Sequence, residues 1–178
     1  MSTRPGPNQF VAAALVAPYA GVSPIVDPQA WLATTAVLVG DVSVAAAASI
    51  SYGAVVRGDI AAVSIGEAAS IQDNVVIHTA FGQPTVIGPG VSVGHGAVVH
   101  GCTIEADCQI GINATILNGA VIGEGSLVAA GAVVLEGTRI PPRSLVAGIP
   151  GRVRRPLSSK ECDKIKERVR LLRTPKPR

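Results

Sequence analysis

The sequence predicts an all-β solenoid of stacked parallel strands followed by a C-terminal α-helix. Three observations predict this fold: a six-residue repeat, a shortage of aromatic side chains and many glycines between the repeats. Of the 178 residues, 48% are hydrophobic but only 3% are aromatic, and 20 are glycine. The length suits one domain, whose core must consist mainly of small aliphatic side chains.

Aliphatic residues recur between Leu32 and Val146 at a nearly constant spacing. Fifteen of the eighteen steps between them are six residues long. The repeated positions are Leu32, Leu38, Val44, Ile50, Val56, Ile65, Ile71, Ile77, Ile87, Val93, Val99, Ile104, Ile110, Ile116, Ile122, Val128, Val134, Ile140 and Val146. Small side chains stand four residues after most of them. Such a short unit cannot bury its apolar side alone, so it must stack on the next one.

The glycines between these positions, such as Gly53, Gly94 and Gly111, suit tight corners. A six-residue period matches neither a helical stripe nor a simple meander of hairpins. We therefore predict short strands joined by corners, with three hexapeptides in each coil. About six coils would form a triangular prism, with parallel strands ~4.7–4.9 Å apart.

The segments on either side of the repeat differ from it. We divide the chain into an N-terminal arm (1–23), the hexapeptide-repeat solenoid (24–155) and a basic helix and tail (156–178). Ser158 and Glu161 have the spacing of a capping box at a helix start. Four apolar residues then fall on one face of the predicted helix: Cys162, Ile165, Val169 and Leu172. We expect this helix to pack along the prism.

The net charge of +3 is unevenly distributed. Residues 1–138 contain two basic and nine acidic side chains, whereas residues 139–178 contain thirteen basic and three acidic ones. A basic tail can bind nucleic acid, but this one lacks interleaved aromatic residues, and we expect a solvated helix and no nucleic-acid partner. No apolar run approaches the length of a membrane-spanning helix, so we expect no membrane span.

The cysteines indicate a reducing compartment. The chain has three, Cys102, Cys108 and Cys162, in no paired motif, which predicts a cytoplasmic protein without a disulfide framework. The apolar run from Phe10 to Ala17 is short for a signal peptide and follows two prolines. We therefore do not interpret it as an export signal.

The only three histidines lie in the middle of the repeat. Counting hexapeptides places His78 and His100 in the same position on adjacent coils. The same count places Arg57 in their column, one coil earlier. Asp73 falls in the column of His95, on a different face of the prism.

These histidines predict a metal site shared between chains. His95 and His100 are five residues apart, ~16 Å along an extended strand, whereas a zinc ligand nitrogen lies about 2.0–2.1 Å from the ion. Three prisms around a threefold axis could bring His95 of one chain to the other two histidines of its neighbour. Three imidazoles with one open position are typical of a catalytic metal site. The alternative is that the histidines are ordinary exposed side chains on a solvated face, but their alignment favours metal binding.

Three segments carry a family resemblance: Arg57-Gly58-Asp59, Ile71 to His78, and Gly94 to Gly101. Together they are similar to the gamma-class carbonic anhydrase family, over roughly residues 24–155. The resemblance implies a left-handed β-helix, a homotrimer with a C-terminal helix on each chain, and zinc, or alternatively iron or cobalt, bound between subunits.

The resemblance also implies individual roles. Three histidines would be the metal ligands: His78, His95 and His100. Arg57 and Asp59 match an interface ion pair near the metal. Gln72 matches a glutamine that hydrogen-bonds the metal-bound water, and Asp73 is the adjacent carboxylate of that motif.

The implied reaction is the reversible hydration of carbon dioxide to bicarbonate. A bound metal lowers the pKa of water from 15.7 toward ~7 and so provides hydroxide at neutral pH. Better-understood members carry an acidic loop that relays the product proton, but here Ile60 follows Asp59 and the four-residue insertion around Thr79–Pro84 contains no carboxylate. We therefore expect weak activity.

Other functions fit the same residues. Metal-bound hydroxide could hydrolyse an ester or thioester, as resemblance to phenylacetate-degradation and carnitine-operon proteins suggests. The protein could also be a non-catalytic metal-binding or assembly protein. Acyl transfer ranks last, because it needs a histidine base rather than three aligned ligands.

Overall fold

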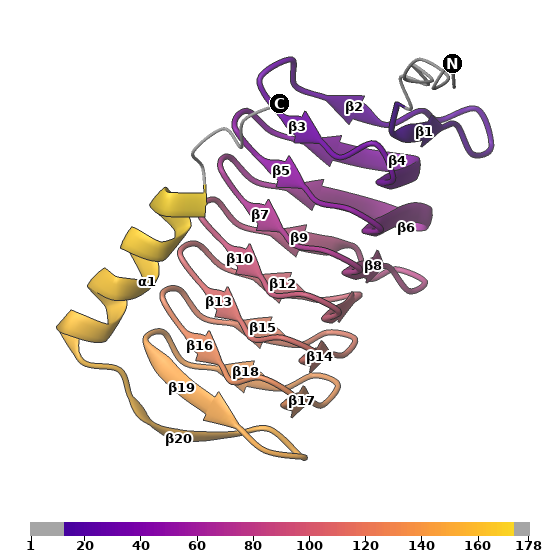
Figure 1. Ribbon diagram of the computed structural model, residues 1–178. Helices are drawn as coiled ribbons and strands as arrows, with labels where there is room; N and C mark the ends of the chain where they lie inside the picture. The colour runs from indigo at the N-terminus through magenta and orange to yellow at the C-terminus, as the bar shows by residue number, and fades with distance from the viewer. Residues whose placement is uncertain (1–12, 173–178) are drawn as a thin grey trace, which may run out of the picture.

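The computed structural model describes residues 13–172, in which short strands wind into a three-sided prism with one helix beside it (Figure 1). This is the left-handed parallel β-helix expected from the sequence. The first face stacks seven parallel strands: β3 (Trp31–Leu32), β5 (Ser49–Ile50), β7 (Ser70–Ile71), β10 (Ser92–Val93), β13 (Gln109–Ile110), β16 (Leu127–Val128) and β19 (Ser144–Ala147). The prism therefore has about seven turns, one more than the six coils predicted from the sequence.

Two long strands bend around a corner and connect the other two faces. They are β4 (Val37–Val44) and β6 (Val55–Ile65), and each contributes its first half to one face and its second half to the next. The face that begins with their first halves continues through β8 (Val76–His78), β11 (Val98–His100), β14 (Thr115–Ile116) and β17 (Val133–Val134). We call it the histidine face.

The third face stacks on the second halves of β4 and β6. Its strands are β2 (Ile25–Val26), β9 (Thr85–Ile87), β12 (Thr103–Ile104), β15 (Val121–Ile122) and β18 (Arg139–Ile140). Strand β20 (Arg152–Pro156) closes the last coil by pairing antiparallel with β19. Strand β1 (Leu15–Ala17) lies within the predicted arm 1–23 and pairs in parallel with β4, so this part of the arm adds a strand to the histidine face.

The core consists of the predicted repeat. The aliphatic positions from Leu38 to Val146 are buried, and Leu32 packs against them half-buried. The small residues four positions later, such as Ala54, Ala97 and Ala114, are buried as well. This alternation of large and small side chains fills the narrow interior of the prism.

Helix α1 (Ser159–Leu172) runs back along the outside of the prism from its last coil (Figure 1). The predicted capping box forms, because Glu161 Oε2 accepts from Ser158 N at 2.9 Å and Ser158 Oγ accepts from Glu161 N at 3.4 Å. Ile165 is buried, and Lys166 Nζ lies 3.2 Å from Asp107 Oδ2. In the described part of the chain, no helix has the length and hydropathy needed to cross a membrane.

Candidate metal centre

The strand register places two histidines side by side on the histidine face. His78 of β8 pairs with His100 of β11, which confirms the column predicted from the hexapeptide count. His78 Nδ1 lies 3.0 Å from His100 Nε2. Side chains alternate along a strand, so the burial of Ile77 turns its neighbour His78 outward.

An ion pair borders these histidines on the preceding coil. Asp59 Oδ1 lies 2.9 Å from His78 Nε2, and the other carboxylate oxygen of Asp59 pairs with Arg57. Burial pushes the pKa of Asp59 upward, but the hydrogen bonds to His78 and Arg57 outweigh it and hold the pKa below its ordinary value. Asp59 is therefore ionised at neutral pH and accepts a hydrogen bond from His78.

The residue between the members of this pair must be glycine. A Cβ atom on Gly58 would collide with the backbone carbonyl of Asp41 on the neighbouring coil. The close approach lets strand β6 turn the corner between two faces. It explains why the Arg57-Gly58-Asp59 segment places both charged side chains beside His78.

His95 lies elsewhere, on the corner between β10 and β11. Its side chain is 52% exposed, and its Nδ1 lies 3.2 Å from Asp73 Oδ2. The backbone N–H of Asp73 also donates to His95 Nδ1 at 3.3 Å. The predicted column of Asp73 and His95 is thus confirmed.

Gln72 belongs to the same side of the molecule as His95. It follows β7, its backbone N–H bonds to Val93 next to the His95 corner, and its side-chain Nε2 donates to Ser92 Oγ at 3.2 Å. The seven predicted site residues therefore form two groups on one chain. One is the column of Arg57, Asp59, His78 and His100, and the other is the corner of Gln72, Asp73 and His95.

Neither group is arranged as a metal site within one chain. Within residues 13–172 of a single chain, no three His, Cys, Asp or Glu side chains are arranged to hold an ion. This agrees with the expectation from the spacing that one chain does not bring all three histidines together.

The structure adds two residues that sequence reasoning missed. His100 Nδ1 lies 2.5 Å from Asn118 Oδ1, and Asn118 Nδ2 lies 3.3 Å from Glu136 Oε1. Both follow aliphatic positions of later coils, Ile116 and Val134, that stack on Val99. The hexapeptide count does not find them, because His100 stands one position after its aliphatic residue and Asn118 and Glu136 stand two positions after theirs.

The insertion after His78 forms a small exposed loop. Ala80 and Gln83 exchange backbone hydrogen bonds, and Phe81 at the tip is 88% exposed. Thr85 anchors the end of the loop: its Oγ1 donates to the His78 carbonyl at 2.5 Å and accepts from the Gly101 N–H at 2.9 Å. The loop therefore adjoins the histidine column at a fixed position.

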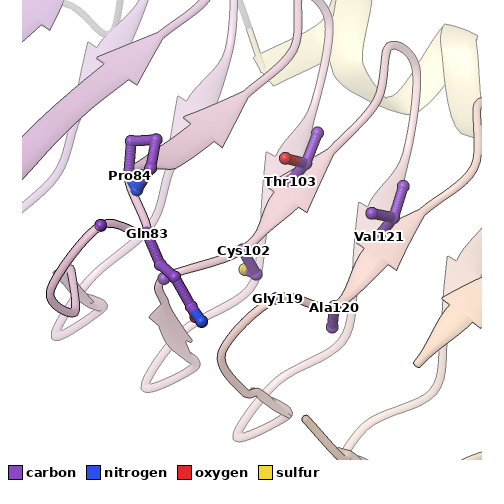
Figure 2. A pocket seen from close by; sticks show the side chains of 9 residues that line it. Gln83, Pro84, Cys102, Thr103, Gly119, Ala120 and Val121 are labelled. Carbon is purple, nitrogen blue, oxygen red and sulfur yellow. The ribbon is translucent and has the colours of Figure 1, made fainter. Parts of the chain in front are cut away.

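A cavity of about 200 Å³ lies between this loop and the next two coils (Figure 2). It is lined by Gly82, Gln83, Pro84, Gly101, Cys102, Thr103, Gly119, Ala120 and Val121. Burial raises the pKa of the Cys102 thiol to about 12. The thiol is therefore protonated at neutral pH and is a poor nucleophile.

Comparisons with known proteins agree with the hexapeptide-repeat fold. A family profile described as "Bacterial transferase hexapeptide (six repeats)" matches residues 101–136. The chain is 56% identical over 136 residues to a Methanocaldococcus jannaschii protein named "Probable carbonic anhydrase", covering 76% of this chain and 86% of that protein. It is 44% identical to the mitochondrial gamma carbonic anhydrase 1 of Arabidopsis thaliana, covering 78% of this chain and only 53% of the plant protein.

A solved structure has the same fold over nearly the whole chain. The hexapeptide transferase family protein from Anaplasma phagocytophilum superposes with a TM-score of 0.86 at 37% identity, covering 89% of this chain and 94% of that one. The similarity therefore extends over most of the chain.

Proposed function

Because the chain belongs to the gamma-class carbonic anhydrase family, we propose that it hydrates carbon dioxide reversibly to bicarbonate at metal sites shared between the subunits of a homotrimer. The observation that carries this proposal is the division of the site residues into two groups on different parts of one chain. The column lacks the imidazole of His95, and the corner lacks the imidazoles of His78 and His100. A trimer would bring the column of one subunit to the corner of its neighbour and so form three equivalent sites.

The two stacked histidines suit a metal ion. His78 Nδ1 and His100 Nε2 face one another at 3.0 Å. Bonds of 2.0–2.1 Å in tetrahedral geometry separate two ligand nitrogens by about 3.3 Å, so a small movement of the rings would accommodate zinc. His95 of a neighbouring subunit would supply the third nitrogen, and imidazole ligands suit iron and cobalt as well.

The outer surface of the histidine face supports its burial between subunits. Its outward side chains are largely aliphatic, and Val76 and Leu135 are 40% and 42% exposed in the single chain. The others are Val55, Val98, Leu117 and Val133. An apolar surface around functional side chains is typical of an interface.

Each side chain then has a task that its contacts support. A bound zinc ion would lower the pKa of a water molecule and provide a nucleophile at neutral pH. Asp59 accepts from His78 and Asp73 contacts His95, so each holds the ring of a ligand in place. Gln72 would orient the water from the His95 side, and Arg57 would hold the Asp59 carboxylate through their ion pair within one chain.

Removal of the product proton would be the slow step. Ile60, where an acidic relay residue would be expected, is an exposed aliphatic side chain, and the loop from Thr79 to Pro84 presents Phe81 instead of a carboxylate. Buffer molecules must then accept the proton directly. Turnover should therefore rise with buffer concentration.

Stopped-flow measurement of carbon dioxide hydration tests this proposal. The protein should be purified without oxygen, loaded with zinc or with iron, and assayed at increasing buffer concentration. Activity that rises with buffer is the expected result. A fully loaded trimer without activity would contradict it, and hydrolysis of a thioester by that same trimer would identify the site as a hydrolase.

A further inference from the structure

Asn118 and Glu136 continue the hydrogen-bonded column beyond His100. Neither belongs to the three ligands or to the segments that carry the family resemblance. Asn118 Oδ1 lies 2.5 Å from His100 Nδ1, and Asn118 Nδ2 lies 3.3 Å from Glu136 Oε1. They are therefore candidates for residues that position the predicted metal ligand His100 without contacting the metal themselves.

The donors and acceptors in this column allow only one arrangement. The amide nitrogen of Asn118 donates to the carboxylate oxygen of Glu136 and therefore faces it. The carbonyl oxygen of Asn118 then faces His100 Nδ1, which must carry a proton. In a neutral imidazole with Nδ1 protonated, the lone pair lies on Nε2, the nitrogen that faces His78.

At the other end of the column, the opposite ring nitrogen of the histidine donates the hydrogen bond. An Asp59 carboxylate oxygen accepts from His78 Nε2, which leaves the lone pair of a neutral His78 on Nδ1. Two lone pairs therefore point at each other across 3.0 Å. This arrangement favours a cation between the two rings.

We propose that Asn118 is a positioning residue that holds His100 with its Nε2 lone pair toward the metal, and that Glu136 acts through Asn118 by fixing the orientation of its amide. The proposal rests on the metal site proposed above, and it assigns roles to two residues outside that site. Outer partners of ligand histidines usually contribute 10- to 100-fold to metal affinity. Asn118 would do so with a neutral amide in place of the more common carboxylate.

Zinc affinity of the assembled protein, measured by competition with a chelator, tests the role of Asn118. Asn118→Leu removes the acceptor and should weaken zinc binding by about 10- to 100-fold while the trimer persists. Asn118→Asp keeps an acceptor oxygen toward His100 and should stay much closer to wild type. An Asn118→Leu trimer with wild-type affinity would overturn the proposal.

The role of Glu136 is tested by a double-mutant cycle. Gln at position 136 can donate as well as accept, so Glu136→Gln no longer forces the orientation of Asn118 and should weaken zinc binding by a smaller factor. In an Asn118→Leu background the same change should have no further effect. Full additivity would show that Glu136 acts independently. The control Glu67→Gln alters an exposed carboxylate at another corner and should change nothing.

A spectroscopic measurement gives a second readout that a merely structural role would not change. The chain has only three histidines, so ¹⁵N-histidine labelling of the deuterated, zinc-loaded trimer yields three ring systems. His100 should show a hydrogen-bonded Nδ1–H that exchanges slowly with water in the wild type and rapidly in Asn118→Leu. A proton on His100 Nε2 instead would overturn the proposal.

The two proposals fail in different ways. Zinc binding without carbon dioxide hydration would overturn the proposed reaction, and the comparison of Asn118 variants would still stand. A wild-type trimer that binds no zinc would overturn both. If Asn118→Leu fails to fold, the ¹⁵N measurement on the wild-type trimer decides, because a proton on His100 Nε2 would overturn the proposal and a proton on Nδ1 would support it.

Discussion

Single buried polar atoms hold the candidate site in place. Thr85 is fully buried, and its hydroxyl links the His78 carbonyl to the Gly101 N–H, which are the backbone groups beside the two stacked histidines. The His78 and His100 rings make the other side-chain contact between these coils. The hydroxyl therefore closes the coil after the insertion and fixes the position of the histidine column.

Thr85→Val should destabilise the protein by about 1–3 kcal/mol, because the valine has nearly the same shape but loses both hydrogen bonds of the buried hydroxyl, while the direct bond from the Gly101 N–H to the His78 carbonyl remains. Chemical denaturation at fixed protein concentration measures this loss. Thr85→Ser should recover much of it. Thr103→Val is the matched control on the next strand, where the threonine side chain is partly exposed, and a similar loss there would refute the assigned role.

At the scale of elements, the helix is attached to the prism mainly through its first turn. Glu161 accepts from the backbone and hydroxyl of Ser158 at 2.9 and 2.8 Å, and it forms two contacts with Arg155 of β20 at 2.9 and 2.7 Å. The hydrogen bonds from Arg155 and from Ser158 lower the pKa of the Glu161 carboxyl far below its ordinary value. One carboxylate thus caps α1 and joins it to the last strand.

This attachment should weaken in acid. Because the pKa of Glu161 is lower in the folded chain, its stabilising contribution is complete above the ordinary value of 4.5 and is lost as the pH falls through the folded value. Hydrogen-exchange protection of the α1 amides, corrected for intrinsic rates, should therefore fall between about pH 5 and pH 2. Glu161→Gln should have low protection throughout and little of this dependence. An equal pH dependence in that variant would contradict the prediction.

The sequence predicted the elements that repeat and missed those that depend on side-chain contacts. The aliphatic spacing predicted the short strands and the column of His78 and His100, because stacking of equal coils turns sequence distance into spatial distance. The spacing of Ser158 and Glu161 predicted the capping box. The spacing could not show that Asn118 and Glu136 extend the column, because a hydrogen bond depends on rotamers. It also placed residues 15–17 in an arm, since the three-residue pairing of β1 with β4 lies outside the hexapeptide period. Val169 and Leu172, predicted on the packed side of the helix, have side chains outside the described residues.

At the scale of the whole molecule, one face should determine assembly. Val76 and Val86 both point outward in the same coil, Val76 on the histidine face and Val86 on the third face. Val76→Glu would bury an unpaired charge at each interface of the proposed trimer, at a cost of about 3–5 kcal/mol per site. Light scattering should find monomers without zinc for Val76→Glu and trimers for Val86→Glu. Trimers in both variants would exclude the histidine face as the interface.

Mixing inactive chains tests whether the site is truly shared. His95→Ala removes the corner ligand and His100→Ala removes a column ligand, so neither homotrimer should bind zinc tightly or hydrate carbon dioxide. In trimers refolded from an equal mixture, a site is complete where the column of a His95→Ala chain meets the corner of a His100→Ala chain. Random assembly creates this arrangement at about one quarter of the interfaces. Zinc content and activity should therefore return to about a quarter of the wild-type value, whereas a site built within one chain would recover nothing. Mixing either variant with Val76→Glu chains, which should not enter the trimer, provides the control.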